Sequence, residues 1–338
     1  MKTLIIAEAG VNHNGDLNTA LKLCDVAKEC GADVVKFQTW ITENIITKSV
    51  AKAEYQKENT NNDDSQYDML KKLELSQDDF RKIKEYCDEI GITFASTADD
   101  RDSLDFLVNL GIPFIKVGSG DIGNVSYLRY IGSKCRPVIL STGMSTLEDI
   151  NISLKALKDG GAKDITLLHC TTNYPCPFDS VNLNAMDTLK KEYDLKVGYS
   201  DHTQGIEVAI AAVAKGATVI EKHFTLDKNM DGPDHLASTE PDEFKKMVDS
   251  IRNIEKALGD GKKVPTNDEK NISKVVFKRI VAIKEIKKGE IISEDKIACK
   301  RNGSGEPASN WDKVVGSIAS KDYSIDEGIE LWNIKYVM

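Results

Sequence analysis

The sequence predicts a (β/α)8 barrel followed by a small β-rich domain. Eight short apolar runs alternate with longer amphipathic stretches, and a barrel of this kind needs about 250 residues. A polar or charged side chain lies at or just past the end of each run. A doubly wound parallel sheet is the competing fold, because periodicity alone does not separate the two. We favour the barrel, since only a closed barrel brings eight strand ends to one mouth.

The eight runs are rich in β-branched residues, which is typical of strands buried on both faces of a parallel sheet. They are TLIIA (3–7), DVVKF (33–37), ITFAS (92–96), FIKV (114–117), PVILS (137–141), ITLLH (165–169), KVGYS (196–200) and TVIEKH (218–223). The side chains at or after their ends are Glu8, Lys36, Ser96, Lys116 with Ser119, Ser141, His169, Ser200 with His202, and His223. We expect these side chains to share one face of the barrel.

Helical segments lie between the apolar runs. Residues 17–30, 146–157, 206–215 and 241–258 carry apolar side chains at helical spacing. Residues 76–90 begin with Ser76 and Asp79 in the spacing of a capping box. The unit between Lys36 and Phe94 contains a long polar insertion that includes residues 59–65. Residues 40–65 are therefore either an ordered lid over the catalytic face or a surface loop.

The composition changes at Gly259. Residues 259–271 (GDGKKVPTNDEKN) are polar and contain Gly and Pro, as is typical of a linker. We therefore place the barrel at residues 1–258, a linker at 259–276 and a second domain at 277–338. In the second domain short apolar runs alternate with turn residues, which predicts a small β-rich fold.

Charge and composition exclude several classes of protein. The 338 residues include 54 acidic and 45 basic side chains, for a net charge of −9. This balance argues against binding to nucleic acid or to an anionic membrane, both of which need a positive surface. No run approaches the roughly 18 apolar residues of a membrane span. The seven cysteines are scattered and form no CxxC motif, so we expect free thiols and a cytoplasmic location.

Two histidines are candidate metal ligands. His202 and His223 follow the seventh and eighth strands, which are neighbours in a barrel, so their imidazoles can converge on one cation. Two imidazoles with oxygen atoms in the other positions suit Mn²⁺, Zn²⁺ or Fe²⁺ better than Mg²⁺. Such a partly open metal acts as a Lewis acid that polarises a carbonyl. A structural role for each histidine is the alternative.

Two lysines and three serines suggest a site for an anion. Lys36 and Lys116 lie inside apolar strands, and Ser119, Ser141 and Ser200 follow strands. Ammonium groups, hydroxyls and glycine amides together suit a phosphate or a carboxylate. A barrel lysine can instead form a Schiff base with a carbonyl substrate.

Three further features bear on the chemistry. GSGDIG (118–123) matches the dinucleotide motif GxGxxG, but no acidic residue ends the next strand at the required distance. Glu8 ends the first strand, where a buried charge must be paired or used. Asp234 follows the last strand in GPDH. A structural salt bridge is the alternative for both carboxylates.

A series of ordered motifs resembles the sialic acid (N-acetylneuraminate) synthases. The motifs are EAGVNHNGD (8–16), KFQT (36–39), KVGSGD (116–121), ILSTGM (139–144), LLHC (167–170), YSDHT (199–203), EKHFTLD (221–227) and GPDHLASTEPDEF (232–244). KKGEIIS (287–293) and CKRNGSGE (299–306) resemble the antifreeze-like (SAF) domain of these enzymes. The resemblance covers nearly the whole chain.

The resemblance implies an activity. Members of the family condense phosphoenolpyruvate with an N-acylated amino sugar aldehyde and water, giving a nine-carbon 2-keto acid and phosphate by C–O cleavage. They use a divalent metal, typically Mn²⁺, with Mg²⁺ or Co²⁺ as alternatives. Their barrel and SAF domain form a domain-swapped homodimer, in which the small domain covers the partner's barrel.

The resemblance also implies roles for particular residues. His202 and His223 would hold the metal, and Glu8 and Asp121 would be catalytic. The residues expected to bind phosphoenolpyruvate are Lys36, Lys116, Ser119, Ser141 and Ser200. The residues expected to bind the sugar are Tyr174, Asp234 and, across the dimer, Arg301, with Glu8 helping to orient it.

The chain departs from the family pattern at several positions. Asp121 stands where the family usually has Glu, Thr172 precedes Asn173 where other versions have Asn first, and Asn302 replaces a proline. The first choice of acceptor is N-acetylmannosamine, giving N-acetylneuraminate, and the second is 2,4-diacetamido-2,4,6-trideoxymannose, giving legionaminate. A Schiff-base pyruvate aldolase and a non-catalytic sugar-binding protein are the competing functions.

Overall fold

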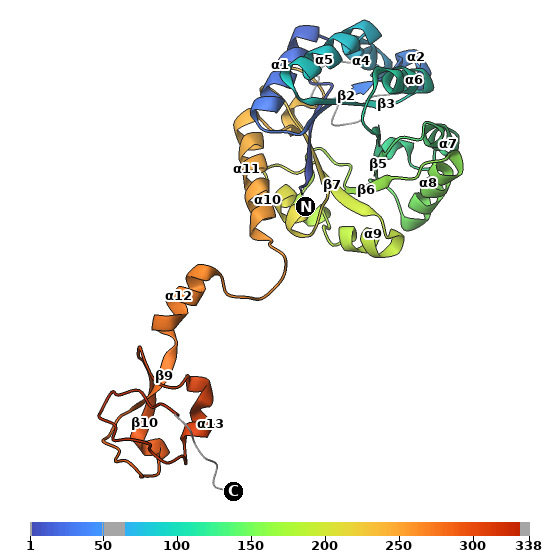
Figure 1. Ribbon diagram of the computed structural model, residues 1–338. Helices are drawn as coiled ribbons and strands as arrows, with labels where there is room; N and C mark the ends of the chain where they lie inside the picture. Colours follow the sequence, from blue (N-terminus) through green and yellow to red (C-terminus); the bar gives the residue numbers. More distant parts are fainter. Residues whose placement is uncertain (1, 49, 51–64, 332–338) are drawn as a thin grey trace. The chain divides into compact units, whose positions relative to one another are not determined.

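The structure is a computed structural model that describes residues 2–48, 50 and 65–331. The expected lid or loop at 40–65 lies in part outside the described residues, since 49 and 51–64 are not among them. The chain divides into two compact units, Met1–Gly259 and Asp260–Met338 (Figure 1). Each unit is described by itself.

The first unit is a closed barrel of parallel strands in the order β1 to β8. The strands are β1 (Leu4–Gly10), β2 (Val34–Thr39), β3 (Thr93–Ala98), β4 (Ile115–Val117), β5 (Val138–Ser141), β6 (Ile165–Cys170), β7 (Lys196–Asp201) and β8 (Val219–His223). Strand β8 pairs with β1 and closes the sheet. The predicted barrel is confirmed, each predicted apolar run overlaps one strand, and the doubly wound sheet is excluded.

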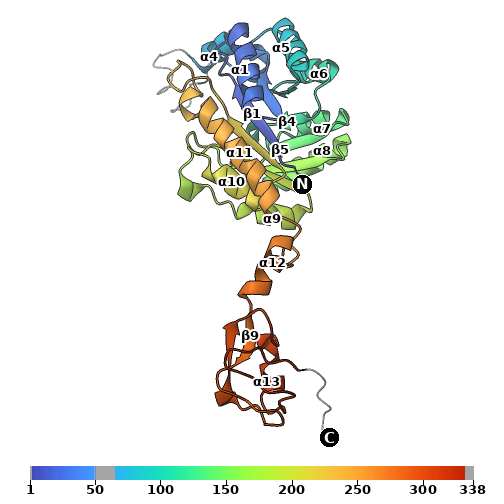
Figure 2. The same cartoon turned by 60° about the vertical axis from the view of Figure 1, so that its left-hand side comes forward.

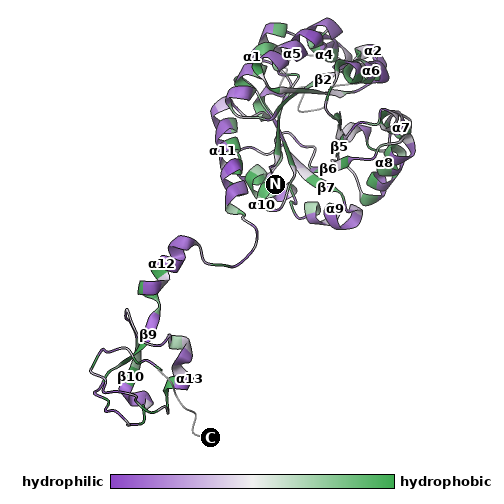
Figure 3. Cartoon of the chain, in the orientation of Figure 1, coloured by the Kyte–Doolittle hydropathy of each residue, from purple (hydrophilic) through white to green (hydrophobic). Residues whose placement is uncertain are grey.

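Helices surround the strands (Figures 1 and 2). They are α1 (Leu17–Glu29), α2 (Thr42–Ile45), α4 (Gln66–Leu73), α5 (Gln77–Ile90), α6 (Arg101–Leu110), α7 (Val125–Ser133), α8 (Leu147–Gly160), α9 (Ala185–Tyr193), α10 (Glu207–Ala214) and α11 (Pro241–Ala257). Ser76 caps α5 by accepting a hydrogen bond from the Asp79 amide, as its spacing predicts. Most of these helices have one apolar and one polar face (Figure 3), whereas α10 is apolar along most of its length, and their apolar side chains pack on the strands in one continuous core.

The inside of the barrel is built in two layers. A small apolar cluster fills its lower part, made of Ile6, Val34, Ala95, Phe114, Ile139, Leu168 and Val219. Because side chains alternate between the two faces of a strand, the residue two positions further along each strand points into the same interior. Those next positions are polar, as in Glu8 after Ile6 and Lys36 after Val34. The apolar layer therefore forms the floor beneath a polar mouth.

The second unit has its own small core. Its elements are α12 (Asn267–Val276), β9 (Lys278–Ala282), β10 (Ile297–Arg301) and α13 (Trp311–Val314), with β9 and β10 antiparallel. The core consists of Ile280, Ala282, Ile286, Ile292, Ile297, Val314, Ala319, Tyr323 and Ile329. Helix α12 lies within the predicted linker at 259–276, and a capping box of Thr266 and Glu269 begins it.

Two findings concern the whole described chain. Within residues 2–48, 50 and 65–331, every helix is too short or too polar to cross a membrane. All seven cysteines are free thiols, as expected.

Candidate active site

A polar cavity of about 180 Å³ opens at the carboxyl ends of the strands. All eight strands contribute to its lining. The strand residues are Glu8, Lys36, Gln38, Thr97, Lys116, Ser141, Cys170, Ser200, Glu221 and His223. Loops that follow the strands add Asp99, Gly118, Ser119, Gly120, Met144, Thr172, Tyr174 and His202. This is the face on which barrel enzymes carry their active sites.

Two of the predicted strand-end residues face away from this cavity. Ser96 shares a hydrogen bond of 2.7 Å with the Thr39 hydroxyl. His169 donates from Nε2 to the carbonyl of Val181 at 2.7 Å. Both predictions were wrong by one position, since a shift of one residue along a strand moves a side chain to the other face. Thr97 and Cys170 line the cavity instead.

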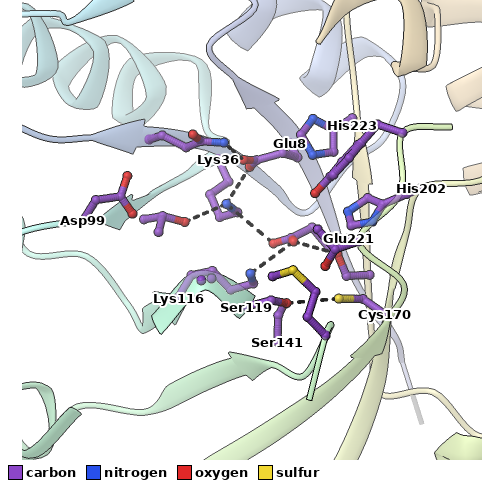
Figure 4. A pocket seen from close by; sticks show the side chains of 18 residues that line it. Glu8, Lys36, Asp99, Lys116, Ser119, Ser141, Cys170, His202, Glu221 and His223 are labelled. Atoms are coloured by element: carbon purple, nitrogen blue, oxygen red, sulfur yellow. Dashed lines mark hydrogen bonds and ion pairs between the residues drawn. The ribbon is translucent and has the colours of Figure 1, made fainter. Parts of the chain in front are cut away.

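Glu221 is the centre of a buried ion network, and sequence reasoning missed it. Its Oε1 lies 3.2 Å from Lys116 Nζ and its Oε2 lies 3.6 Å from Lys36 Nζ. Ser200 Oγ donates to Oε1 at 3.0 Å. Figure 4 shows the carboxylate between the two ammonium groups. Burial alone would raise the pKa of Glu221, but the two lysines lower it to about 2, so the carboxylate is charged at neutral pH.

Glu8 sits on the other side of Lys36. Its Oε2 is 2.7 Å from Lys36 Nζ, and Gln38 Nε2 donates to its Oε1 at 3.0 Å. Burial raises the pKa of Glu8 to about 7 despite the opposing charge of Lys36. Burial would lower the pKa of Lys36, but Glu221 and Glu8 raise it above its usual value. At neutral pH Lys36 is therefore an ammonium, whereas Glu8 can exchange a proton.

The two imidazoles meet at the edge of the cavity. The ring centroids of His202 and His223 are 5.6 Å apart, and Tyr174 lies 4.2 Å from the His202 ring. His202 Nδ1 donates to the Thr171 carbonyl at 2.7 Å, which leaves its Nε2 as the acceptor. Burial lowers the pKa of His202, and burial followed by repulsion from His202 lowers that of His223 to about 3. Both rings are therefore neutral at pH 7.

These histidines fit a metal ion as a pair. Neutral imidazoles are the ligand form, and His223 Nδ1 is buried with no hydrogen-bond partner among residues 2–48, 50 and 65–331. A backbone carbonyl that orients the other ring, as Thr171 does, is typical of ligating histidines. No group of three or more His, Cys, Asp and Glu side chains suited to a metal occurs in the described part of the chain.

Hydroxyl groups line the same cavity as the two lysines. Ser119 Oγ accepts a hydrogen bond of 2.9 Å from the Gly143 amide. A Cβ atom at Gly143 would lie 2.3 Å from Thr172 Oγ1, so only glycine allows this close approach. The hydroxyls of Ser141 and Thr172 are buried without a hydrogen-bond partner within the described residues. Buried polar groups are normally bonded, so these hydroxyls are available to a ligand.

The structure brings most of the predicted site residues together. Those that line the cavity are Glu8, Lys36, Lys116, Ser119, Ser141, Tyr174, Ser200, His202 and His223. Asp234 lines an adjoining cavity. Asp121 does not line the cavity, and its carboxylate accepts a hydrogen bond from Asn124 at 3.0 Å. Arg301 lies on β10 in the second unit.

A signal in the sequence could have found the missed residues. Glu221 is two positions before His223, and Gln38 is two positions after Lys36. Strand periodicity therefore puts each on the same face as a residue that the sequence analysis did select.

Comparisons with known proteins identify the family of the chain. The NeuB family model matches residues 23–263, and the SAF domain model matches residues 279–331. The N,N'-diacetyllegionaminic acid synthase of Campylobacter jejuni is 51% identical over 329 residues, 96% of this chain and 98% of that protein. The N-acetylneuraminate-9-phosphate synthase of Homo sapiens is 37% identical over 305 residues, 90% of this chain and 83% of that protein.

A solved structure is also similar. The N-acetylneuraminic acid synthetase of Leptospira borgpetersenii, solved with citrate, superposes with a TM-score of 0.71 at 36% identity. The superposition covers 80% of this chain and 90% of that one.

A further carboxylate, Asp99, is half-buried and lines the cavity. Burial raises its pKa from 3.8 to about 7, and the nearby Asp121 adds to the effect, while Lys36 opposes it. Between pH 3.8 and about pH 7, Asp99 is protonated in the folded chain and ionised in the unfolded chain. The cost of ionising Asp99 in the folded state therefore grows until about pH 7, so this carboxylate reduces stability at neutral pH.

We predict that Asp99→Asn stabilises the protein more at pH 8 than at pH 5. The difference should be on the order of 1 kcal/mol, measured from urea unfolding at the two pH values. Asp194→Asn is the control, because Asp194 is an exposed residue at the end of α9. An equal effect of Asp99→Asn at both pH values would show that Asp99 ionises normally.

Proposed function

Since the chain belongs to the NeuB family, we propose that it is a phosphoenolpyruvate-dependent synthase of a nine-carbon sugar acid. The observation that carries this proposal is the pair of ammonium groups, Lys36 and Lys116, held around Glu221 in the same cavity as two neutral imidazoles. Phosphoenolpyruvate has a phosphate and a carboxylate, both of which such ammonium groups bind. An aldehyde beside the imidazole pair would complete the reactants.

We propose 2,4-diacetamido-2,4,6-trideoxymannose as the acceptor, with legionaminate as the product. This reverses the order that the motifs suggested, in which N-acetylmannosamine came first. The support for the change is the 51% identity to a legionaminic acid synthase, compared with 37% to an N-acetylneuraminate-9-phosphate synthase. N-acetylmannosamine remains the second candidate.

Four residues of the cavity would bind the phosphate of phosphoenolpyruvate. Lys36 and Lys116 supply positive charge, and the unpartnered hydroxyls of Ser141 and Thr172 supply hydrogen-bond donors. Because these groups are fixed before substrate arrives, they stabilise the charge that grows on the leaving phosphate without reorganising. A divalent cation, Mn²⁺ first and Mg²⁺ or Co²⁺ as alternatives, would be held by His202 and His223 and would supply Lewis-acid polarisation of the aldehyde oxygen.

Glu8 handles a proton during the reaction. C3 of the enol attacks the aldehyde carbon, which leaves positive charge at C2, and water then adds at C2. Glu8, with a pKa near 7, accepts the proton of that water. The resulting hemiketal phosphate loses phosphate by C–O cleavage and forms the 2-keto acid. The oxygen of the former aldehyde takes up a proton and becomes a hydroxyl.

Other roles implied by the family likeness belong to the proposal as well. We propose that Asp234 and Tyr174 bind the sugar, and that Arg301 reaches its N-acyl group from a partner chain in a domain-swapped homodimer. Asp121 is proposed to assist the acid–base chemistry from the edge of the site. We also propose a cytoplasmic location and the division into a barrel (1–258), a linker (259–276) and a SAF domain (277–338).

The competing functions have weaker support. A Schiff-base aldolase needs a neutral amine, whereas Lys36 is paired with two carboxylates that raise its pKa. A non-catalytic sugar-binding protein does not require this buried ion network, which is costly to desolvate. Release of phosphate from phosphoenolpyruvate in the presence of the acceptor would separate a synthase from both.

The first prediction concerns which bond of phosphoenolpyruvate breaks. With ¹⁸O in the bridging C–O position, the label should leave with inorganic phosphate, because water supplies the new oxygen at C2. Mass spectrometry of the phosphate and the keto acid measures this. Label retained in the keto acid would refute the proposed route.

The second prediction concerns metal binding. His223→Ala should weaken Mn²⁺ binding at least about tenfold, since one of two imidazole ligands is lost. Isothermal titration with Mn²⁺ in the presence of phosphoenolpyruvate measures this independently of turnover. His169→Gln is the matched control, because His169 does not line the cavity. Unchanged Mn²⁺ affinity in a folded His223→Ala protein would remove His223 from the metal site.

A further inference from the structure

A second cavity adjoins the first. It has a volume of about 200 Å³, and Gln38, Tyr174 and His223 line both cavities, so these three side chains lie between the two. Its other walls come from the loop after β1, from helix α4 and from the loop after β8. Of the imidazole pair, His223 lines this cavity, whereas Lys36 and Lys116 line the first cavity alone.

The wall formed by α4 is apolar. Met69, Leu70 and Leu73 of α4 line the cavity together with Val11. Met69, Leu73 and Val11 also pack with Trp40 in a buried cluster, and Leu70 is packed against that cluster. Apolar side chains therefore form most of one side of the cavity.

The structure fixes α4 in place. Glu74, directly after the helix, accepts hydrogen bonds from the amide and the hydroxyl of Thr42. Gly15, with a φ of +75°, packs so closely that a Cβ atom there would lie 2.4 Å from the Lys72 carbonyl oxygen. Because these contacts hold both sides of the helix end, the apolar wall is preformed, as in most specific ligand sites.

One charged group faces this wall. Asp234 lines the same cavity, and its carboxylate has no hydrogen-bond or ionic partner in the described part of the chain. Burial alone raises its pKa to about 6. Asp234 is half-buried, and a carboxylate in this position is stabilised when a ligand donates an N–H or O–H to it.

We infer that this second cavity holds the C4–C6 end of the acceptor, and that α4 selects a sugar with an acylamino group on C4 and a methyl group at C6. This inference rests on the proposed function, which puts the aldehyde carbon at the imidazole pair and so directs the rest of the sugar into the second cavity. A methyl or acyl group packs favourably on Leu70 and Met69. A hydroxyl that faces these apolar side chains instead would lose water without gaining a hydrogen-bond partner on that wall. Asp234 accepts a hydrogen bond from the same end of the sugar.

The two candidate acceptors differ in these groups. N-acetylmannosamine carries hydroxyls at C4 and C6, whereas 2,4-diacetamido-2,4,6-trideoxymannose carries an acetamido group at C4 and a methyl group at C6. The cavity has an apolar wall and one hydrogen-bond acceptor, Asp234, and this combination favours the second sugar. Discrimination in an apolar pocket is typically about 10- to 200-fold.

The test compares the two sugars on one variant. Leu70→Asn puts an amide on the wall at a residue that is only partly buried. We expect kcat/KM for the trideoxy sugar to fall about tenfold and kcat/KM for N-acetylmannosamine not to fall, with KM for phosphoenolpyruvate unchanged. The readout is phosphate release. Because the ratio of the two kcat/KM values does not depend on the folded fraction, partial unfolding cannot imitate the result.

Two control variants accompany Leu70→Asn. Leu70→Met keeps the wall apolar and should keep the wild-type preference. Leu258→Asn makes the same chemical change at an exposed leucine after α11 and should also keep it. An unchanged ratio in Leu70→Asn, or wild-type protein that uses both sugars equally, would overturn the inference and leave the synthase activity standing. Absence of phosphate release by the wild type with both sugars would overturn the proposed function itself.

Discussion

The site depends on one buried carboxylate, Glu221, that holds two lysines inside the barrel. Three charges removed from water are costly unless they are paired at short range. Glu221 meets this condition, because Lys116 and Lys36 lie 3.2 and 3.6 Å from its oxygens and Ser200 donates a hydrogen bond to it. Two ammonium groups face one fully ionised carboxylate, Glu221, and one carboxyl with a pKa of about 7, Glu8, which leaves positive charge for a bound anion. The network thus prepares the mouth of the barrel for a substrate rich in negative charge.

The barrel makes this arrangement possible by stacking two layers. The apolar layer, with Ile6 and Val34 among its members, lies below the polar one and keeps water from its underside. Burial then acts differently on each group. It raises the pKa of Glu8 to about 7 and lowers that of His223 to about 3. A proton acceptor active near neutrality and neutral imidazoles both follow from the same low-dielectric environment.

The sequence predicted the barrel and most of the polar layer because strand ends carry an evident signal. A lysine within an apolar run, as at Lys36, has few structural explanations. Errors arose because neighbouring residues of a strand point to opposite faces of the sheet. The prediction chose Ser96, whereas its neighbour Thr97 lines the cavity. Glu221 was missed because a glutamate in the polar segment Glu221-Lys222-His223 resembles a surface residue. Only the assignment of His223 to the cavity shows that Glu221, two positions earlier on the strand, points to the same side. The wall formed by α4 depends on tertiary packing against Gly15, which no local pattern in the sequence reveals.

The most direct test of this account is the dissociation constant of phosphoenolpyruvate for Lys116→Gln. Loss of a charge-assisted contact worth about 1.5–3 kcal/mol should weaken binding roughly 10- to 100-fold. Lys222→Gln is the matched control, because Lys222 is a buried lysine paired with Asp201 that lies outside the cavity. We expect weaker phosphoenolpyruvate binding in Lys116→Gln and unchanged binding in Lys222→Gln. Equal affinity in the two folded variants would contradict it.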